Sequence, residues 1–117
     1  MEIAALPLND DASDLMQGTL AMLILRSLSD GAKHGYAVAD FIRRRSDGVL
    51  RVKEGALYPA LHRLETHGWV GSEWGFSENK RRAKFYRLTA AGAKELTANG
   101  ARWSRVTTAI AKVMETP

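Results

Sequence analysis

The sequence predicts a mainly helical fold with one small β-hairpin, and three features of the chain indicate it. Three segments with apolar residues at helical spacing come first, two short segments rich in aromatic and β-branched residues follow, and a fourth helical segment closes the chain. The length of 117 residues and the hydrophobic content of 45% suit one domain with a small core. No repeat or low-complexity tract divides the sequence into further modules.

The first helix is expected from Asp14, after an arm at residues 1–13. The arm contains Pro7 and several acids without a clear period, which favours a flexible acidic segment. From Asp14 onward apolar residues dominate, so this helix should be largely buried. Asp30 and Gly31 supply its stop signal.

A second helix is expected at residues 34–48, which read HGYAVADFIRRRSDG. Val38, Ala39 and Ile42 share its inner face, and Gly48 should terminate it. The bases Arg43 to Arg45 suit the negative end of the helix dipole.

The third helix, residues 54–67, contains two residues that cost stability inside a helix, Gly55 and Pro59. Its inner face is apolar, whereas its outer face combines small or ring-closed residues with three side chains that can reach a base or a phosphate. On a helical wheel the inner residues are Leu57, Ala60, Leu61 and Leu64, and the outer ones are Gly55, Ala56, Tyr58, Pro59, His62 and Arg63. No carboxylate lies on this outer face, so it suits close approach to a large anionic surface.

The pattern leaves the start of the third helix open. A start near Lys53 or Glu54 places Pro59 just beyond the first turn, where it should bend the helix slightly. A start near Ala56 makes Pro59 almost free of cost. A third alternative treats Gly55 and Pro59 as markers of a loop before a short helix from Pro59 to His67.

A hairpin is expected from residues 69–75 and 82–88, whose aromatic and β-branched content favours strands. The FSENKR segment between them is longer and more charged than a compact turn needs. Tyr86 and Leu88 would share one face of the second strand. Three other aromatic residues are interpreted as packing in the wing, in the core or against the first helix: Trp69, Trp74 and Tyr36.

The last helix is expected from a cap at Thr89 to about Met114. Its apolar residues form a heptad-like seam that Asn99 and Gly100 weaken in the middle. The seam contains Leu96, Trp103, Val106, Ile110 and Val113.

Three helices followed by strand, turn and strand is the order of a winged helix-turn-helix, predicted here for residues 14–88. In that architecture the third helix enters the major groove of DNA, and the hairpin, or wing, lies against the neighbouring backbone or minor groove. The charge distribution agrees with this interpretation. The whole chain carries +4, but residues 1–14 hold four acids and no base, which leaves seventeen bases against nine acids, or +8, on the remainder.

Basic residues flank the third helix in sequence, between Arg43 and Lys53 on one side and between Lys80 and Arg87 on the other. Such a pair of clusters around a helix face without carboxylates is typical of a DNA-binding surface. Phosphate contacts should make binding salt-dependent, whereas the three long outer side chains of the helix would read the bases. The predicted DNA contacts are Arg51, Lys53, Gly55, Tyr58, Pro59, His62, Arg63, Lys80, Arg81, Arg82 and Lys84, the last four in a wing at residues 76–84.

Other classes of protein fit the sequence poorly. The absence of cysteine excludes disulfides and thiolate metal sites. The three histidines lack metal-helix spacing and no catalytic or phosphate-loop motif is present, so neither an enzyme nor a cofactor is expected. The acidic N-terminus differs from a signal peptide, and the longest apolar run, Leu20 to Leu25, is far shorter than the roughly 20 residues that span a bilayer. A cytoplasmic protein without membrane contact is expected.

The segment GALYPALHRLETHGWV resembles the recognition-helix signature of the PadR family of bacterial transcriptional regulators, in which Gly-x-Leu-Tyr-Pro leads into Arg-Leu-Glu and a Gly-terminated helix. QGTLAMLILRSL and HGYAVADFI are similar to the first two helices of that family, and RRAKFYRLTAAGAKEL to its second wing strand and following helix. The resemblance covers residues 15 to about 98 closely and is strongest to short members with one C-terminal helix. It departs at Ala56, where the family more often has Thr or Ser.

The resemblance implies a homodimeric repressor that binds a near-palindromic operator in double-stranded DNA, with its recognition helix at residues 54–67. It also implies that residues 89–117, helped by the first helix, form the dimer contact through the seam described above. Some relatives sense aromatic compounds at that contact, which makes Trp103 a candidate effector contact, although a plain interface anchor is the favoured interpretation. We expect the protein to act on the bacterial nucleoid. The alternative is a winged-helix module that binds protein, which would leave the basic wing without a role.

Overall fold

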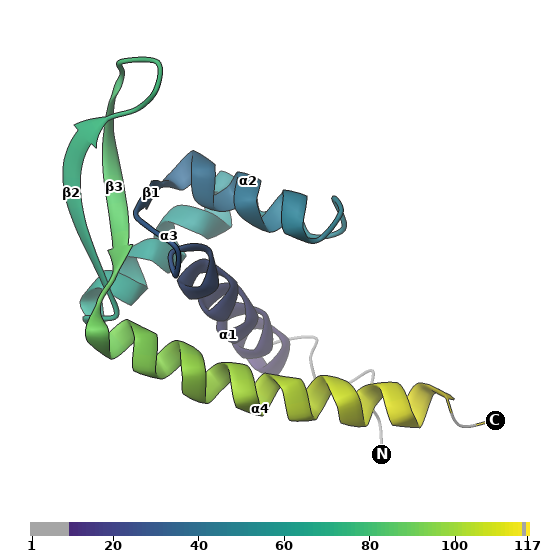
Figure 1. Ribbon diagram of the computed structural model, residues 1–117. Helices are drawn as coiled ribbons and strands as arrows, with labels where there is room; N and C mark the ends of the chain where they lie inside the picture. Colours follow the sequence, from purple (N-terminus) through teal and green to yellow (C-terminus); the bar gives the residue numbers. More distant parts are fainter. Residues whose placement is uncertain (1–9, 116) are drawn as a thin grey trace.

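The computed structural model describes residues 10–115 and 117, with side chains from residue 18 onward. Helix α1 spans Asp10–Ser27, α2 Gly35–Arg45, α3 Glu54–Thr66 and α4 Ala90–Glu115. Strand β1 spans Lys33–His34, β2 Val70–Phe76 and β3 Arg82–Leu88. Figure 1 shows α1, α2 and α3 gathered beside the base of the sheet, the β2–β3 hairpin rising away from them, and α4 running along the base of the molecule. The predicted class, mainly α with a small antiparallel sheet, is confirmed.

The three strands form one antiparallel sheet in the order β1-β3-β2. Strands β2 and β3 pair from Val70 opposite Leu88 to Phe76 opposite Arg82. Since Val70 is buried and Phe76 is exposed, the base of this hairpin belongs to the core and its tip projects into solvent.

Strand β1 was not predicted, because His34 was assigned to the second helix. His34 instead has an extended backbone and pairs with Phe85 of β3. Its Nδ1 atom accepts the N–H of Ala37 at 3.3 Å, so the side chain caps α2, which begins at Gly35. The same residue therefore ends an edge strand and starts a helix.

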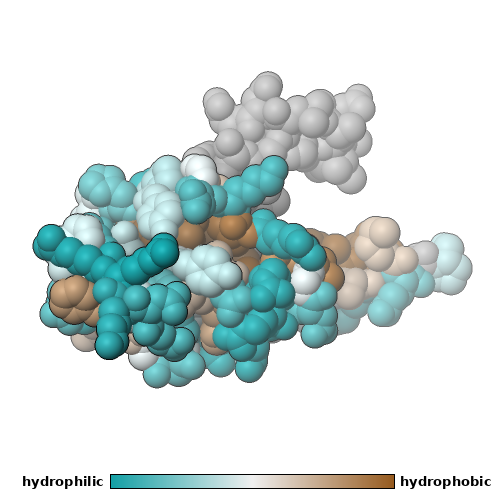
Figure 2. All heavy atoms as spheres, turned by 90° about the horizontal axis from the view of Figure 1, so that it is seen from above, coloured by the Kyte–Doolittle hydropathy of each residue, from teal (hydrophilic) through white to brown (hydrophobic). Residues whose placement is uncertain are grey.

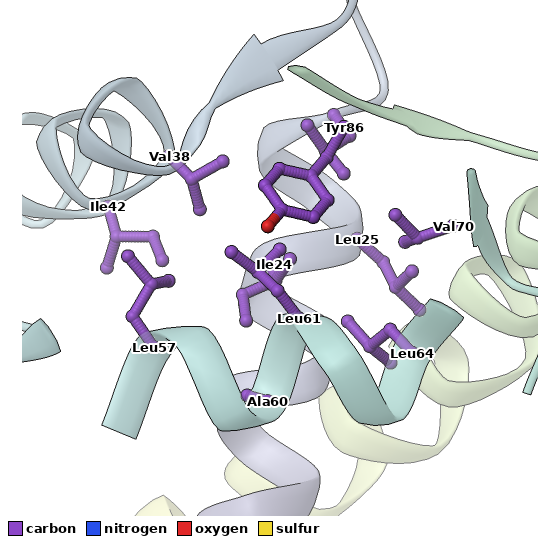
Figure 3. Close-up of a cluster of buried hydrophobic side chains, with 11 residues drawn as sticks. Ile24, Leu25, Val38, Ile42, Leu57, Ala60, Leu61, Leu64, Val70 and Tyr86 are labelled. Atoms are coloured by element: carbon purple, nitrogen blue, oxygen red, sulfur yellow. The ribbon is translucent and has the colours of Figure 1, made fainter. Parts of the chain in front are cut away.

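The core lies where α1, α2, α3 and the base of the sheet meet (Figure 3). The inner-face residues predicted for α3 are all buried and point toward these neighbours. Ala39, predicted to face inward from α2, is only partly buried at the edge of this cluster. The buried residues are Ile24, Leu25, Leu28, Val38, Ile42, Leu57, Ala60, Leu61, Leu64, Val70 and Tyr86.

Helix α1 begins at Asp10, four residues before its predicted start at Asp14. Residues 10–13 thus belong to the helix, and the remainder of the predicted arm, residues 1–9, lies outside the described residues. Acidic residues suit the positive end of a helix, so Asp10 and Asp11 are compatible with a start that apolar periodicity alone does not reveal.

Thr89 fixes the start of α4 against the hairpin. Its hydroxyl accepts the N–H of Gly92 at 3.0 Å and donates to the carbonyl oxygen of Gly68 at 2.7 Å, which confirms the predicted cap. Gly92 is required because a Cβ there would lie 2.0 Å from the carbonyl oxygen of Trp69. From this anchored start α4 continues for 26 residues, past the end of the core, in a molecule of 54 × 26 × 26 Å.

Candidate nucleic-acid interface

Helix α3 presents one exposed face, and it is the predicted one. Its exposed residues include Gly55, Ala56, Tyr58, Pro59, His62 and Arg63. The helix begins at Glu54 with Lys53 as its N-cap, so Pro59 lies in the second turn. The earlier of the two starts is therefore correct, and the loop alternative is wrong. Pro59 leaves the carbonyl group of Gly55 without its usual helical donor, at a position where Gly55 adds no side chain of its own.

Tyr58 lies on α3 but packs against the start of α2. A Cβ at Gly35 would lie 2.7 Å from the Tyr58 hydroxyl oxygen and 2.8 Å from ring carbon Cε1. The tyrosine ring thus occupies the space that this glycine leaves, while 45% of the residue remains exposed. Tyr58 links α2 to α3 and still presents an edge on the outer face. Sequence inspection did not identify Gly35, because its partner lies 23 residues away.

His62 and Arg63 are both exposed but lie on different flanks of α3. On a wheel of about 100° per residue His62 lies beside Tyr58, and Arg63 lies on the far side. Arg63 borders an open groove between α3 and α1, where Gly18 and Ala21 line the opposite wall. The outer face therefore has a polar side chain at each edge and small or ring-closed residues between them.

The wing is the β2–β3 hairpin, and its turn is more compact than predicted. Strand β2 continues to Phe76, and the N–H of Ser77 donates to the carbonyl oxygen of Arg81 at 2.8 Å. Lys80 closes the turn in the left-handed conformation, with a φ of 60°, and donates its N–H to the carbonyl oxygen of Ser77 at 2.9 Å. The expectation of a longer loop is wrong because strand pairing extends to the pair of Phe76 and Arg82. Lys80, Arg81 and Arg82 are exposed around this tip.

Glu65, in the last turns of α3, fastens the wing to the helix. Its carboxylate accepts the hydroxyl of Ser72 at 2.6 Å and pairs with Lys84 at 3.2 Å. The bond from Ser72, followed by that from Lys84, lowers the pKa of Glu65 below its usual value despite partial burial. Lys84, predicted as a DNA contact, is thus already held by α3, and Glu65 is more than the surface or capping residue that the sequence suggested.

The bases that precede α3 differ in their surroundings. Arg43 and Arg44 both donate to the carboxylate of Asp40, at 2.5 and 2.7 Å, and these bonds lower the pKa of Asp40. Arg51 donates to a backbone carbonyl group in the turn after α2, at 3.2 Å. Arg51 and Lys53 are exposed, so of the predicted cluster they are the cations nearest in sequence to α3.

The seam on α4 is divided between two environments. Leu96 packs against the core and lines a groove between α4 and α1, together with Met22, Leu23, Arg26, Thr97, Gly100 and Ala101. Trp103 is partly buried. Beyond it Val106 is 40% exposed, Ile110 55% and Val113 72%. The distal half of the helix therefore keeps an apolar stripe in solvent.

Three aromatic residues test the packing interpretations. Trp69 is partly buried and stacks on His67 with ring centroids 4.5 Å apart, as expected for a packing residue. Trp74 is 61% exposed on the wing and Tyr36 is 76% exposed. Tyr36 lies beside His34, with ring centroids 6.4 Å apart. The assignments of Trp74 to the core and of Tyr36 to the face of α1 are wrong, because both positions lie outside the cluster that α3 organises.

Three helices, a short edge strand and a basic hairpin beside an exposed helix face define a winged helix-turn-helix protein, a class that binds DNA. The chain belongs to the PadR-like family of transcriptional regulators, whose family pattern matches residues 24–98. It is thus a DNA-binding regulator, and members of this family are not enzymes.

Similar proteins agree with this assignment. The transcriptional regulator Rv3488 of Mycobacterium tuberculosis is 33% identical over 84 residues, which cover 72% of this chain and 75% of that protein. A transcriptional regulator from Clostridium thermocellum has a structure with a TM-score of 0.74 and 33% identity, covering 85% of this chain and 96% of its own. A PadR family regulator from Eggerthella lenta gives a TM-score of 0.69 and 32% identity, covering 91% and 90%.

The described part of the chain contains no helix with both the length and the apolar character that crossing a membrane requires.

Proposed function

We propose that this regulator is a homodimeric repressor that binds a near-palindromic operator, with α3 in the major groove and the wing on the flanking DNA. The observation that carries the proposal is the outer face of α3. It is exposed, lacks carboxylates and is bordered by the cations of the wing tip. Small residues at Gly55 and Ala56 let the first turn approach the duplex closely, and His62 and Arg63 reach outward from its two edges.

The apolar stripe on distal α4 supports the dimer. Val106, Ile110 and Val113 are exposed, and on a helical wheel they fall within one arc with Leu96 and Trp103. Such a stripe is favourable only when a second apolar surface covers it, and a second copy of this chain supplies the same surface. A two-fold axis would then present two α3 helices to half-sites about one helical turn, or a multiple of it, apart.

The groove between α1 and α4 supports a role for that region in effector control. It lies beside Leu96 and Gly100, at the inner end of the proposed dimer contact. A flat aromatic compound bound near Trp103 would change the spacing of the two recognition helices and release the operator. A plain anchor role for Trp103 needs no ligand and is the simpler explanation. The proposed site of action is the nucleoid DNA of a bacterial cytoplasm.

Fluorescence anisotropy with duplex DNA over a salt series tests the proposal. We expect the logarithm of the binding constant to fall with the logarithm of salt concentration with a slope of several units, because each neutralised phosphate contributes about 0.9. Genome-wide recovery of bound fragments should then give a near-palindromic sequence. A flat salt response, or no binding at low salt, would contradict the proposal and favour a winged-helix module that binds protein.

A further inference from the structure

Two aromatic side chains on the wing take no part in the core. Trp74 is 61% exposed and Phe76 is 73% exposed. They occupy alternate positions of β2 and so lie on one face of the hairpin. The strand register places Lys84 opposite Trp74 and Arg82 opposite Phe76 on that same face. We call these four residues the wing aromatic patch.

The wing aromatic patch lies on the side of the sheet that packs against α3. Closer to the core, Ser72 and Lys84 on this side both bond to Glu65 of α3. On the helical wheel Glu65 lies beside Tyr58, on the flank of α3 that also carries His62. A ligand that lies across the outer face of α3 therefore meets the wing through its aromatic side.

The surroundings of the patch show what chemistry its partner must have. The Arg82 guanidinium lies 4.6 Å from the centre of the Trp74 ring, and Lys80 and Arg81 are exposed at the tip. Figure 2 looks down on this end of the molecule and shows a brown patch ringed by hydrophilic side chains. An apolar protein surface would leave these cations without partners. The patch fits a partner in which anionic and apolar surfaces alternate over a few ångströms.

We propose that the wing aromatic patch enters the minor groove of the bound DNA. This inference rests on the proposed function, because it assumes that α3 lies in the adjacent major groove. The minor groove is about 6 Å wide, which admits single side chains, and its walls are apolar deoxyribose faces between two rows of phosphates. Phe76 and Trp74 pack against the sugars, Arg82 follows Trp74 into the groove, and Lys80 and Arg81 bind phosphates outside it.

Two consequences distinguish this arrangement from a wing that only contacts phosphates. The apolar contacts contribute affinity that salt does not remove, since they release no counterions. In addition, narrow minor grooves of A·T-rich DNA attract an inserted arginine. The wing should therefore confer a preference for A·T-rich DNA where the patch inserts.

The test compares variants of the full chain by anisotropy on two labelled duplexes of random order, one A·T-rich and one G·C-rich, over a salt series. Trp74→Thr with Phe76→Thr keeps β-propensity and every cation. We expect it to weaken binding about tenfold or more at each salt concentration, with an unchanged salt slope, because about one buried aromatic side chain's worth of apolar contact is lost. Its preference for the A·T-rich duplex should fall, as should competition by the minor-groove ligand netropsin.

Three controls make the outcome specific. Glu73→Thr alters the neighbouring residue on the opposite face of β2 and should not weaken binding. Lys80→Ala with Arg81→Ala should lower the salt slope by about two units, which marks the loss of phosphate contacts. Trp74→Phe should restore most of the affinity lost in Trp74→Thr. Far-UV circular dichroism and thermal unfolding of each variant check that the hairpin is intact.

The results separate the inference from the proposed function. If the wild-type chain binds with a steep salt slope and the double threonine variant binds equally well, the minor-groove contact is wrong and the proposed function stands. If the double variant changes only the sedimentation coefficient, the patch binds another copy of the chain, and the inference is again overturned. If the wild-type chain does not bind duplex DNA, the proposed function fails first.

Discussion

Helix α3 and the distal half of α4 are both amphipathic, but the chain treats their apolar faces in opposite ways. The inner face of α3 is covered by α1, α2 and the sheet, with Leu61 fully buried. The apolar stripe of α4 beyond Trp103 has no cover in the described part of the chain, and Ile110 is 55% exposed. The comparison teaches that α3 is positioned by its own fold, whereas distal α4 is completed only by another surface.

This difference also separates the two proposed tasks. A helix whose apolar side is fully used can present its other side to a polar ligand without risk of collapse onto it. An exposed stripe of about the same width is instead a surface for association. The binding of DNA and the formation of a dimer can thus be disrupted independently.

The largest effect on stability should come from the covered helix. Leu61→Ala removes a fully buried side chain at the centre of the core and should lower the free energy of unfolding by about 2–5 kcal/mol. The matched change Ile110→Ala on the uncovered helix should leave the unfolding of the monomer nearly unchanged. Urea unfolding at a protein concentration below the dimer dissociation constant measures both. Equal losses would mean that α4 contributes to the monomer core more than its exposure indicates.

The next effect should appear in association. Val106→Asp with Ile110→Asp introduces two charges into the exposed stripe and should weaken the dimer at least about a hundredfold, since charges buried at an interface without partners are costly. Sedimentation velocity should then show a monomer. Thr108→Asp, on the opposite side of the same helix, is the control and should leave the dimer intact. Dimers that survive the double change would move the interface away from α4.

Local pattern was sufficient for α3. Its apolar residues recur at helical spacing, and each of the four predicted inner positions, including Leu57 and Leu64, is buried. The cap at Thr89 was equally predictable, because capping depends on a few neighbouring residues. These features are encoded within one or two turns, so the sequence alone reveals them.

Contacts between distant segments were not predictable. The bonds that join Glu65 to Ser72 and Lys84 link residues up to 19 positions apart, and no local period marks them. The ring of Tyr58 over Gly35 is a similar case. The exposed Trp74 was assigned to packing because aromatic residues are usually buried, and only the strand register shows that it lies beyond the core. The DNA contacts themselves stay predictions.

A smaller effect is expected at the edge of the α3 face. Arg63→Ala should cost about 1–3 kcal/mol of binding to the operator and less on random DNA, because a base contact carries sequence preference. Lys80→Ala should weaken binding to both kinds of DNA alike, since a phosphate contact does not discriminate. Anisotropy with the recovered operator and a scrambled duplex measures the ratio. Equal ratios for the two variants would place the base-reading side chains elsewhere on α3.

The smallest effect concerns the junction between α3 and the wing. Glu65 has a pKa lowered mainly by the bond from Ser72 and then by Lys84, so its charged form stabilises the folded state. That contribution is complete above the ordinary pKa of 4.5 and is lost as the pH falls through the lower pKa of the folded protein. Because Lys84 is 38% exposed, solvent screening limits the contribution to about 1 kcal/mol.

Glu65→Gln should therefore lower the free energy of unfolding by about 1 kcal/mol at neutral pH and by less at acidic pH, where the wild-type carboxyl is itself protonated. Glu73→Gln, at an exposed position on the opposite face of β2, serves as the control and should show no comparable pH-dependent difference. Urea unfolding at both pH values gives the two differences. A constant difference across pH would show that Glu65 acts through packing and not through its charge. The junction matters for binding because it sets the position of the wing relative to α3, so the same variant should weaken DNA binding even though its own side chain is a carboxylate whose removal would favour a polyanion.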